Sequence, residues 1–493
     1  MATIVEEPDR LAAAAVWDGL RRLAMLPDWL SAIADPARVA TALTSQVSEF
    51  AAGDLTLRAC RVDRIRLKDG HWTALYQLTV AGPGADGAAG RAVWLSGTLR
   101  PPGQEEPPPA GTPAAFGTED WAGYLPDLRL ALRTQPPDAD LPILPQLTDP
   151  LEARALLERA IRAGSPAYVD ITIEACTPQV MRYKPGSRCT ILYYLGYPPA
   201  LAADHHWPAF VVAKTYQGKK GQTAYGGMRA LWNSPLGAGD VVTVAEPLAF
   251  VPELGLLIQG PIPGNRTLKD LIRAALRTGA PEVLEELHAT LRRTAAGLAA
   301  LHQSGVQAGK VRDYADALGE VREMIDELAA LIPDVAGAAT PLFDRLTALA
   351  ATYRADADGP AHGSFRPAQV LLHEGRVGFI DFDSFCRSEP ARDLALFLSN
   401  IISVGLNTGA EEEDDEPVDV AGNLDYLDQL EGLAEIFLAH YESLAPISRS
   451  RLALWSAAMV FIQVLEYWTK VKPARLKNMI FLLERRLRTT GLV

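Results

Sequence analysis

The sequence predicts an α+β protein in which a β-rich first half precedes a helical second half. Between about Leu55 and Gln259 the apolar segments are short and alternating or β-branched, as in antiparallel strands. From Thr267 onward the apolar residues recur mostly at helical spacing. The length of 493 residues, with 48% hydrophobic and 22% charged residues, suits a globular chain. A chain of this length has room for roughly two to four domains.

The individual elements follow from these patterns. Strands are expected at residues 55–67, 71–80, 91–99, 169–183, 189–197, 210–216 and 254–259. Helices are expected at residues 267–279, 281–305, 424–444 and 451–468, the first two ending in glycine. Residues 369–383 interrupt the helical half as a small hairpin, with two apolar runs joined by His373-Glu374-Gly375-Arg376. Loops are expected at residues 82–90 and 101–113, which are rich in Pro and Gly, and at the acidic residues 411–419.

Charge and composition limit the partners. The net charge of −13 repels phosphate backbones and anionic lipid, so neither nucleic acid nor a membrane is an expected partner. The first residues lack the basic and apolar segments of a signal peptide, and no run of about 18 apolar residues follows, so a cytoplasmic location is expected. The four cysteines are far apart, which favours small buried apolar groups over a disulfide or zinc site.

An internal repeat lies within the β-rich half. Residues 55–70 align without a gap with residues 171–186, and after one inserted residue the register continues. Matched pairs include Cys60 with Cys176, Arg66 with Arg182, Tyr76 with Tyr193 and Thr98 with Thr215. We therefore expect a duplicated β-rich unit, in which Gly97 of the first copy stands at the position of Lys214 in the second.

Three charged residues could carry chemistry. Lys214 lies in the middle of an apolar strand, where an ammonium is costly unless it reaches a partner or extends to the surface. Asp381 and Asp383 follow an apolar strand two residues apart, and residues i and i+2 of an extended segment share a face. Such paired carboxylates suit a divalent cation, especially magnesium that carries nucleotide phosphates, but they would also suit a turn with capping aspartates.

The order of the motifs is more specific than any one of them. The strand lysine is followed by a helical half, by His-Gly-x-Phe-x-Pro at residues 362–367, by Ile-Asp-Phe-Asp at 380–383, and by Pro-Ala-x-Asp-Leu-Ala at 390–395. This order resembles the aminoglycoside phosphotransferase and choline kinase-like family over about residues 169–493. The resemblance implies a bilobal protein-kinase-like fold, with a β-rich small lobe and a helical large lobe, preceded here by the extra β-rich unit. It also implies that Asp393 is buried and braces the catalytic loop.

The resemblance further implies that ATP and Mg²⁺ bind between the lobes. Lys214 would bind the nucleotide phosphates, and Asp381 and Asp383 would hold the magnesium ion. The strand, turn and strand at residues 180–194 would cover the nucleotide, and residues 256–264 would form the hinge. The other nucleotide-binding residues implied in these two segments are Lys184, Gly186, Arg188 and Gln259.

Three polar positions depart from the family pattern. The catalytic loop of such kinases has an aspartate that accepts the proton of the substrate hydroxyl, and an asparagine five residues later on the metal. This chain has Ser364 and Gln369 at those places, so Gln369 would be the metal ligand. The helix expected at residues 222–232 contains no glutamate that could pair with Lys214.

Two functions therefore stay open. In the first, the chain is an ATP-dependent phosphotransferase whose acceptor is a small hydroxylated molecule such as a sugar, aminoglycoside or amino alcohol. Arg366 or Arg188 would neutralise phosphate, and Asp383 or the substrate would replace the missing base, with Ser364 in the catalytic loop. In the second, the chain is a pseudokinase that binds nucleotide, or none, and acts as a scaffold or regulatory partner.

The motifs also suggest a domain division. Residues 1–165 would form a helical leader and a degenerate small-lobe-like unit, residues 166–262 the nucleotide-binding small lobe, and residues 263–493 the helical large lobe. The N-terminal unit would offer a surface for a protein partner or for a homodimer. The acidic residues 411–419 lie between large-lobe helices, where the resemblance implies that the acceptor binds, so a cationic acceptor is expected.

Overall fold

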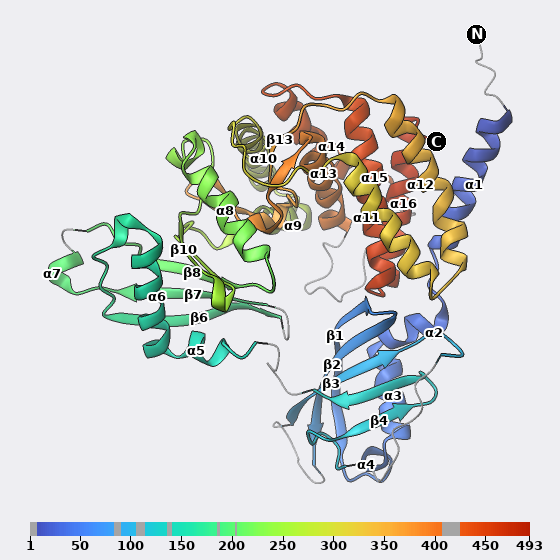
Figure 1. Ribbon diagram of the computed structural model, residues 1–493. Helices are drawn as coiled ribbons and strands as arrows, with labels where there is room; N and C mark the ends of the chain where they lie inside the picture. The colour runs from blue at the N-terminus through green and yellow to red at the C-terminus, as the bar shows by residue number, and fades with distance from the viewer. Residues whose placement is uncertain are drawn as a thin grey trace. The chain divides into compact units, whose positions relative to one another are not determined.

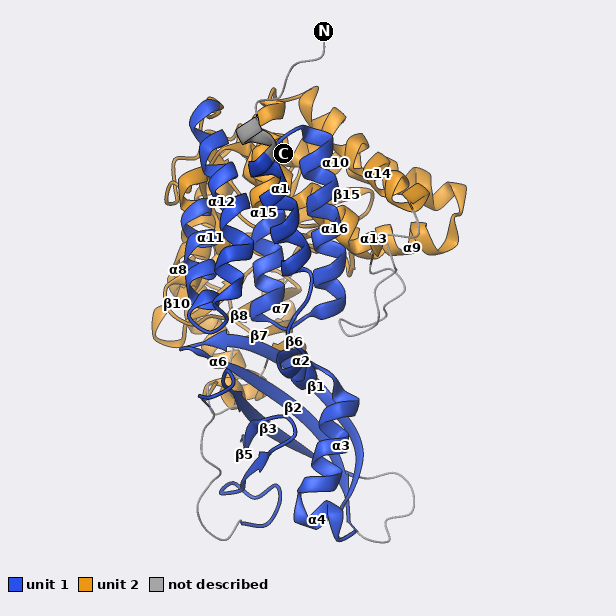
Figure 2. Ribbon diagram, turned by 90° about the vertical axis from the view of Figure 1, so that its right-hand side faces the viewer, with its two compact units in different colours: residues 1–137, 317–352, 460–493 blue, residues 138–316, 353–459 orange. Residues whose placement is uncertain are grey.

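The computed structural model describes most of the chain. The described residues are 7–82, 90–104, 114–135, 141–184, 188–202, 205–406 and 424–493. Gly186, the acidic residues 411–419 and most of the two loops expected in the first half therefore lie outside the described residues. The chain divides into two compact units, one of residues 1–137, 317–352 and 460–493, the other of residues 138–316 and 353–459 (Figure 2).

The first unit combines a sheet with helices from both ends of the chain. Its helices include α1 (Glu7–Leu23), α2 (Asp28–Ser31), α3 (Pro36–Gln46), α4 (Ser48–Ala51), α12 (Asp334–Thr352) and α16 (Pro473–Thr490). Its strands are β1 (Thr56–Lys68), β2 (His71–Ala81), β3 (Arg91–Leu99), β4 (Ala122–Leu125) and β5 (Leu130–Thr134). Helix α1 packs against α12 and α16, which explains why segments distant in sequence belong to one unit.

The second unit contains a similar sheet covered by one helix (Figure 1). Its strands are β6 (Ala175–Lys184), β7 (Arg188–Gly196), β8 (Phe210–Thr215), β10 (Pro247–Val251) and β11 (Leu256–Gln259). Helix α6 (Pro150–Gly164) packs on β6 and β10 and follows the short α5 (Leu144–Thr148). Ile161 on α6 joins Ile173, Ile191 and Val211 in one buried apolar cluster, so the hydrophobic effect holds helix and sheet together.

The two sheets share one topology, as the predicted duplication requires. The strand orders are β1-β2-β3-β5-β4 and β6-β7-β8-β11-β10, and in each case a preceding helix packs on the first strand. The ladder registers also agree. Cys60 lies opposite Leu78 in the first sheet, and Cys176 lies opposite Leu195 in the second, as the repeat aligns them.

One part of the predicted alignment is wrong by one residue. Thr73 pairs with Thr98, whereas Thr190, the counterpart of Thr73, pairs with Lys214. Thr98, not Gly97, therefore occupies the place of Lys214 in the first sheet, and Gly97 lies on the buried face. The connection between the second and third strands is one residue shorter in the second copy, and the sequence matches alone did not reveal this. The first copy still has no lysine at that place.

The remaining strands of the β-rich half differ in detail from the prediction. Residues 169–174 precede the strand instead of belonging to it, since β6 begins at Ala175. The short strands β4, β5 and β10 were not expected. Strands of four or five residues carry too few alternations to stand out in the sequence.

The helices predicted for the second half are present. They are α9 (Leu268–Thr278), α10 (Pro281–His302), α14 (Leu424–Glu442) and α15 (Arg449–Thr469). The second half also contains α11 (Tyr314–Ala329) and α13 (Pro390–Leu406). Thr267 and Asp270 cap the start of α9 reciprocally, and Gly279 ends it in the left-handed conformation that glycine tolerates best. Local capping signals thus set the bounds of α9.

The predicted hairpin is formed by β14 (Val370–His373) and β15 (Arg376–Phe379). Glu374 and Gly375 have φ angles of 46° and 72°, the positive values that a tight two-residue hairpin turn requires. Strands β12 (Arg266–Thr267) and β9 (Thr243–Val244) flank the hairpin on its two sides. The hairpin therefore has a fixed place from which the chain runs into Asp381.

Two further features bear on the environment of the protein. All four cysteines are free thiols, and Cys176, Cys189 and Cys386 are buried. Within the described residues, α15 is the one helix long and apolar enough to cross a membrane, and 72% of its most apolar window is buried. A core helix of a soluble protein passes the same test, so α15 gives little support for a membrane span.

Candidate active site

Strand β8 presents Lys214 from the sheet of the second unit. The residues on either side of it fix the register of the strand. Thr215 points to the opposite face, where its Oγ1 accepts a hydrogen bond of 2.7 Å from the backbone N–H of Cys189. The N–H of Tyr216 donates to the carbonyl of Gly255 at 2.8 Å. Because side chains alternate along a strand, Lys214 and Tyr216 share one face.

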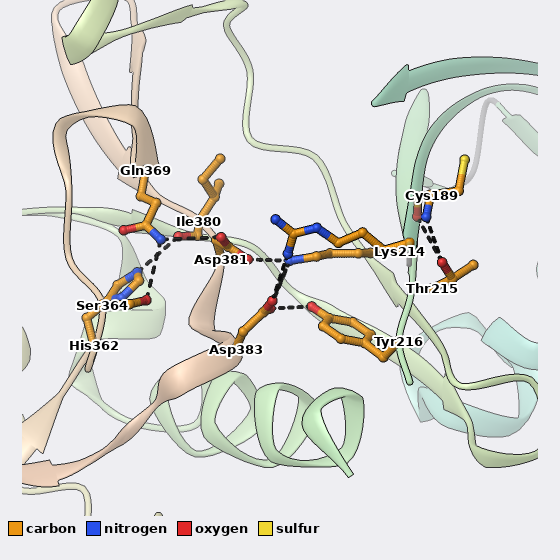
Figure 3. Close-up of polar contacts among 11 residues, drawn as sticks. Cys189, Lys214, Thr215, Tyr216, His362, Ser364, Gln369, Ile380, Asp381 and Asp383 are labelled. Carbon is orange, nitrogen blue, oxygen red and sulfur yellow. Dashed lines mark hydrogen bonds and ion pairs between the residues drawn. The ribbon is translucent and has the colours of Figure 1, made fainter. Parts of the chain in front are cut away.

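The ammonium of Lys214 contacts two carboxylates (Figure 3). Its Nζ donates to Oδ1 of Asp381 and to both oxygens of Asp383, at 2.9 Å and 2.8 Å for Asp383. The three side chains are only 14%, 29% and 15% exposed, for Lys214, Asp381 and Asp383 respectively. The lysine therefore reaches buried partners instead of extending to the surface, and the Coulomb attraction is stronger than it would be in open water.

The backbone at Asp381 turns the two carboxylates toward the lysine. Asp381 has a φ of 73°, in the left-handed region that aspartate tolerates better than most residues. It precedes a short 3₁₀ turn, η6 (Phe382–Ser384), whose Phe382 is buried. Unusual backbone conformations of this kind are frequent at functional sites because the surrounding structure has to enforce them.

The environment shifts the pKa values of the two aspartates in opposite directions. Burial by itself would raise the pKa of Asp381, but the charge and hydrogen bond of Lys214 hold it well below the ordinary value. Burial, followed by the negative charge of Asp381, raises the pKa of Asp383 despite Lys214. Arg188 adds a weaker contact, with Nη1 at 3.4 Å from Oδ2 of Asp383. The raised pKa of Asp383 therefore reflects burial and the closeness of two carboxylates that share one ammonium.

Gln369 connects Ser364 with these carboxylates. Its Nε2 lies 3.3 Å from Oδ2 of Asp381 and 3.4 Å from Oγ of Ser364. Its Oε1 is buried and has no hydrogen-bond partner among the described residues. A buried acceptor without a partner is costly unless a cation or donor completes it.

The residues at this place fit a magnesium ion. Mg²⁺ prefers hard oxygen ligands and usually keeps one or two protein carboxylates beside phosphate oxygens and waters. Asp381, Asp383 and the free Oε1 of Gln369 supply such oxygens. The described part of the chain has no group of three or more His, Cys, Asp or Glu side chains that could hold a metal ion, so this site would need the phosphates of its nucleotide.

Asp393 is fully buried, as predicted, and contacts the backbone at residues 362–363. Its carboxylate accepts hydrogen bonds from the backbone N–H groups of His362 and Gly363, at 2.7 Å and 2.8 Å. Nε2 of His302 lies 3.2 Å from the same carboxylate, and Nδ1 of His302 lies 2.7 Å from the hydroxyl of Tyr441. Burial opposes the charge, but these contacts hold the pKa of Asp393 below its ordinary value. His302 was not predicted, because a single histidine in a helix gives no signal in the sequence.

Tyr216 is the second residue that sequence reasoning missed. Its hydroxyl donates to Oδ1 of Asp383 at 2.5 Å, and its ring lies beside the ammonium of Lys214. Burial and the charge of Asp383 raise the pKa of Tyr216 far above the ordinary value, so its hydroxyl remains a donor. Its position two residues after Lys214 in a strand was the available signal.

Helix α8 (Lys220–Trp232) follows β8 and packs against η6. A side chain at Gly227 would collide with the ring of Phe385, so the glycine allows the close approach. The helix has no Asp or Glu, so the carboxylate partners of Lys214 come from the segment that it packs against.

The other predicted site residues are less closely grouped. Arg366 is exposed, and no ion pair between described residues joins it to Asp381 or Asp383. Lys184 and Gln259 are half-buried at the ends of β6 and β11. Gly186 lies outside the described residues. The structure thus brings together Lys214, Asp381, Asp383, Arg188, Gln369 and Ser364.

Comparison with known families matches residues 232–436 to APH, the phosphotransferase enzyme family. The matched region includes Ser364, Gln369, Asp381 and Asp383 but begins after Lys214. No curated protein matches the chain.

Several solved structures are distantly similar. One is a glucosamine kinase in complex with glucosamine, ADP and inorganic phosphate, 18% identical, with a TM-score of 0.41 over 95% of this chain and 100% of that chain. A choline/ethanolamine kinase family protein from Mesorhizobium loti is 13% identical, with a TM-score of 0.43 over 69% and 97% of the two chains. A choline kinase from Cryptosporidium parvum is 10% identical, with a TM-score of 0.46 over the same shares.

The family match covers most of the predicted large lobe and the predicted metal-binding segment, and it begins within the predicted small lobe. Residues 232–436 are thus similar to the phosphotransferase enzyme family, and the chain has a protein-kinase-like fold with a β-rich small lobe and a helical large lobe.

Proposed function

We propose that the chain is an ATP-dependent phosphotransferase that acts on the hydroxyl group of a small molecule. The observation that supports this most is the convergence of one ammonium on two carboxylates. Beside them lies a buried amide oxygen that has no hydrogen-bond partner among the described residues. These side chains can bind different parts of MgATP. The lysine can turn to the phosphates, and the carboxylates can take the metal.

The residues then have distinct roles in the proposal. Lys214 binds the phosphates, while Asp381, Asp383 and Gln369 hold Mg²⁺, which would neutralise charge on the phosphates. The nucleotide also contacts the segments that contain Lys184, Arg188 and Gln259. Arg188 is the cation best placed to neutralise a transferred phosphate, because it already contacts Asp383.

The transfer itself is an in-line displacement. The acceptor oxygen forms a bond to the γ-phosphorus as the bond from that phosphorus to the bridging oxygen of ADP breaks. The acceptor proton passes to Asp383 or to the transferred phosphate, because Ser364 cannot act as a base near neutral pH. Loose transition states of this kind depend mainly on positioning and electrostatics, so the missing aspartate slows the reaction without abolishing it.

A pseudokinase is the second candidate function. Two observations favour it: the serine at the expected base position, and the absence of an acidic residue from α8. In this case the site binds nucleotide without consuming it, or binds none, and the N-terminal unit offers the surface for a protein partner or a second copy.

The acceptor and the location are proposed from the family resemblance. A sugar, aminoglycoside or amino alcohol has the required hydroxyl group, and the acidic residues 411–419 favour a cationic member of this class. A cytoplasmic location is part of the same proposal.

The test is a melting experiment with ATP, with and without Mg²⁺, followed by transfer of labelled phosphate to a panel of amino sugars and amino alcohols. A ligand that binds only the folded state adds about 2.7 kcal/mol at 100 times its dissociation constant, so modest affinity is measurable. We expect a magnesium-dependent shift and labelled product. A shift without product in any acceptor or in hydrolysis would favour the pseudokinase, and no shift at millimolar ATP would reject the nucleotide site.

The matched variants are Asp381→Asn and Asp358→Asn. The first removes a charge from the proposed metal site, so we expect it to abolish the magnesium-dependent part of the shift. The second removes a charge from a surface ion pair with Arg387 and leaves the site intact. Equal behaviour of the two variants would contradict the metal assignment.

A further inference from the structure

We infer that Tyr216 is a positioning residue that holds Asp383 and Lys214 in place of an acidic residue on α8. The inference rests on the proposed function, because it assigns Tyr216 to the binding of MgATP at that site.

The first observation is that Tyr216 contacts both members of the pair. Its hydroxyl donates to Oδ1 of Asp383 at 2.5 Å. The Nζ atom of Lys214 lies 4.9 Å from the centroid of its ring, within the range of a cation–π interaction. One side chain thus combines a donor for the carboxylate with a surface for the ammonium.

The second observation is that the position of Tyr216 is fixed. Its backbone N–H donates to the carbonyl of Gly255 at 2.8 Å, which continues the ladder beyond the end of β8. Gly255 has a φ of 55°, and a side chain there would collide with the carbonyl oxygen of Tyr216. These contacts therefore fix the backbone from which the side chain of Tyr216 extends to Asp383.

The need for such a residue follows from the charges. When Lys214 turns from the carboxylates toward phosphate, Asp383 loses its strongest partner, and α8 has no carboxylate to steady the lysine. The hydroxyl of Tyr216 would still bond Oδ1 of Asp383 and would leave Oδ2 available to a metal ion. The ring would remain beside the path of the ammonium. Tyr216 therefore keeps both groups oriented in the loaded state, where they no longer hold each other.

The experiment separates hydroxyl from ring. The variants are Tyr216→Phe, which keeps the ring, and Tyr216→Leu, which removes both. Tyr225→Phe is the matched control, since Tyr225 lies on α8 in the same lobe and its ring stacks on Phe250. The dissociation constant of ATP is measured by calorimetry without and with Mg²⁺, and the ratio gives the gain from magnesium. The melting temperature of each ligand-free variant reports the fold.

We expect Tyr216→Phe to bind ATP without magnesium as tightly as the wild type does. The gain in ATP affinity from magnesium should be about tenfold smaller, because the variant loses a hydrogen bond to a charged group. Tyr216→Leu should in addition weaken metal-free ATP binding about two- to tenfold, because the ammonium loses the ring. Tyr225→Phe should change neither quantity.

Two results would overturn the inference in different ways. If wild type shows the gain and Tyr216→Phe keeps all of it, the hydroxyl has no positioning role, while the proposed function stands. If Tyr216→Phe has a lower melting temperature but an unchanged gain in ATP affinity from magnesium, the hydroxyl likewise has no positioning role. The hydrogen bond then only stabilises the fold. If wild type shows no gain from magnesium, the proposed function fails and the inference fails with it.

Discussion

The ammonium of Lys214 lies 2.8 Å from Oδ2 of Asp383, although 169 residues separate the two along the chain. The lysine comes from the central strand of the small-lobe sheet, and the aspartate follows the hairpin of the large lobe. In this arrangement the lysine occupies the place beside the carboxylates that a metal ion would take. Nucleotide-free protein is therefore expected to bind divalent cations weakly.

Lys214→Met should change the affinities for metal and nucleotide in opposite directions. Removal of the ammonium leaves two facing carboxylates without their counter-ion, so Mn²⁺ alone should bind more tightly than in the wild type. ATP should bind roughly ten- to 100-fold more weakly, the usual cost of losing a hydrogen bond between charged groups. Calorimetric titration of each ligand measures both effects.

Lys220→Met is the control for this change, because Lys220 is exposed at the start of α8 in the same lobe. It should leave both affinities unchanged. Unaltered ATP affinity in Lys214→Met would remove Lys214 from the nucleotide site.

Ser364→Asp should raise the rate of phosphate transfer or of ATP hydrolysis. A positioned base contributes about 10² to 10⁴ in rate, and Nε2 of Gln369, 3.4 Å from the serine oxygen, could hold the new carboxylate. Single-turnover assays with labelled ATP measure the change. Ser364→Asn introduces a side chain of similar shape to aspartate but without a basic group, so its rate should not rise above that of the wild type. A lower rate in Ser364→Asp would show that the serine has its own role.

Gln369→Leu should reduce the gain in ATP affinity that Mg²⁺ provides. The change removes the buried Oε1, which has no partner in the described part of the chain. Even residues that only orient metal ligands contribute about ten- to 100-fold to metal affinity, so a loss of at least tenfold is expected. Gln369→Asn keeps an amide oxygen and should lose less. Equal gains in Gln369→Leu and wild type would show that the amide does not reach the metal.

Asp393→Asn should destabilise the fold and change its pH dependence. An asparagine places an NH₂ group toward backbone donors that need an acceptor, and loss of a buried charge partner costs about 3–5 kcal/mol. The folded-state pKa of Asp393 lies below its ordinary 3.8, so its stabilising contribution is complete above that value. The contribution is lost as the pH falls through the lower folded-state pKa.

The measurement is the free energy of unfolding in urea from pH 7 down to pH 3. Wild type should lose more stability over the acidic part of this range than Asp393→Asn does. Asp358→Asn, whose side chain is 39% exposed in its ion pair with Arg387, should cost less than about 1 kcal/mol. Parallel curves for wild type and Asp393→Asn would contradict the low pKa.

The sequence by itself determined the order of elements and the identity of the charged residues. Strand alternation indicated the central strands of both sheets, capping and terminal glycines marked α9, and the Glu374-Gly375 pair marked the hairpin turn, because these features depend on local conformation. The order of the motifs indicated the resemblance to the phosphotransferase family and the burial of Asp393.

The tertiary structure decided what these residues touch. The packing of α1 on α12, the counterpart of Lys214 at Thr98, and the contacts of Tyr216 and His302 depend on strand register and on residues far apart in the chain. When two repeats differ by one residue in a connection, every pair of aligned residues after that connection is shifted by one position. Matches between the sequences do not show in which connection the difference lies. The strand determines only the direction in which the side chain of Tyr216 points. The hydrogen bond from Tyr216 to Asp383 forms because the tertiary fold brings the segment after the hairpin next to the sheet.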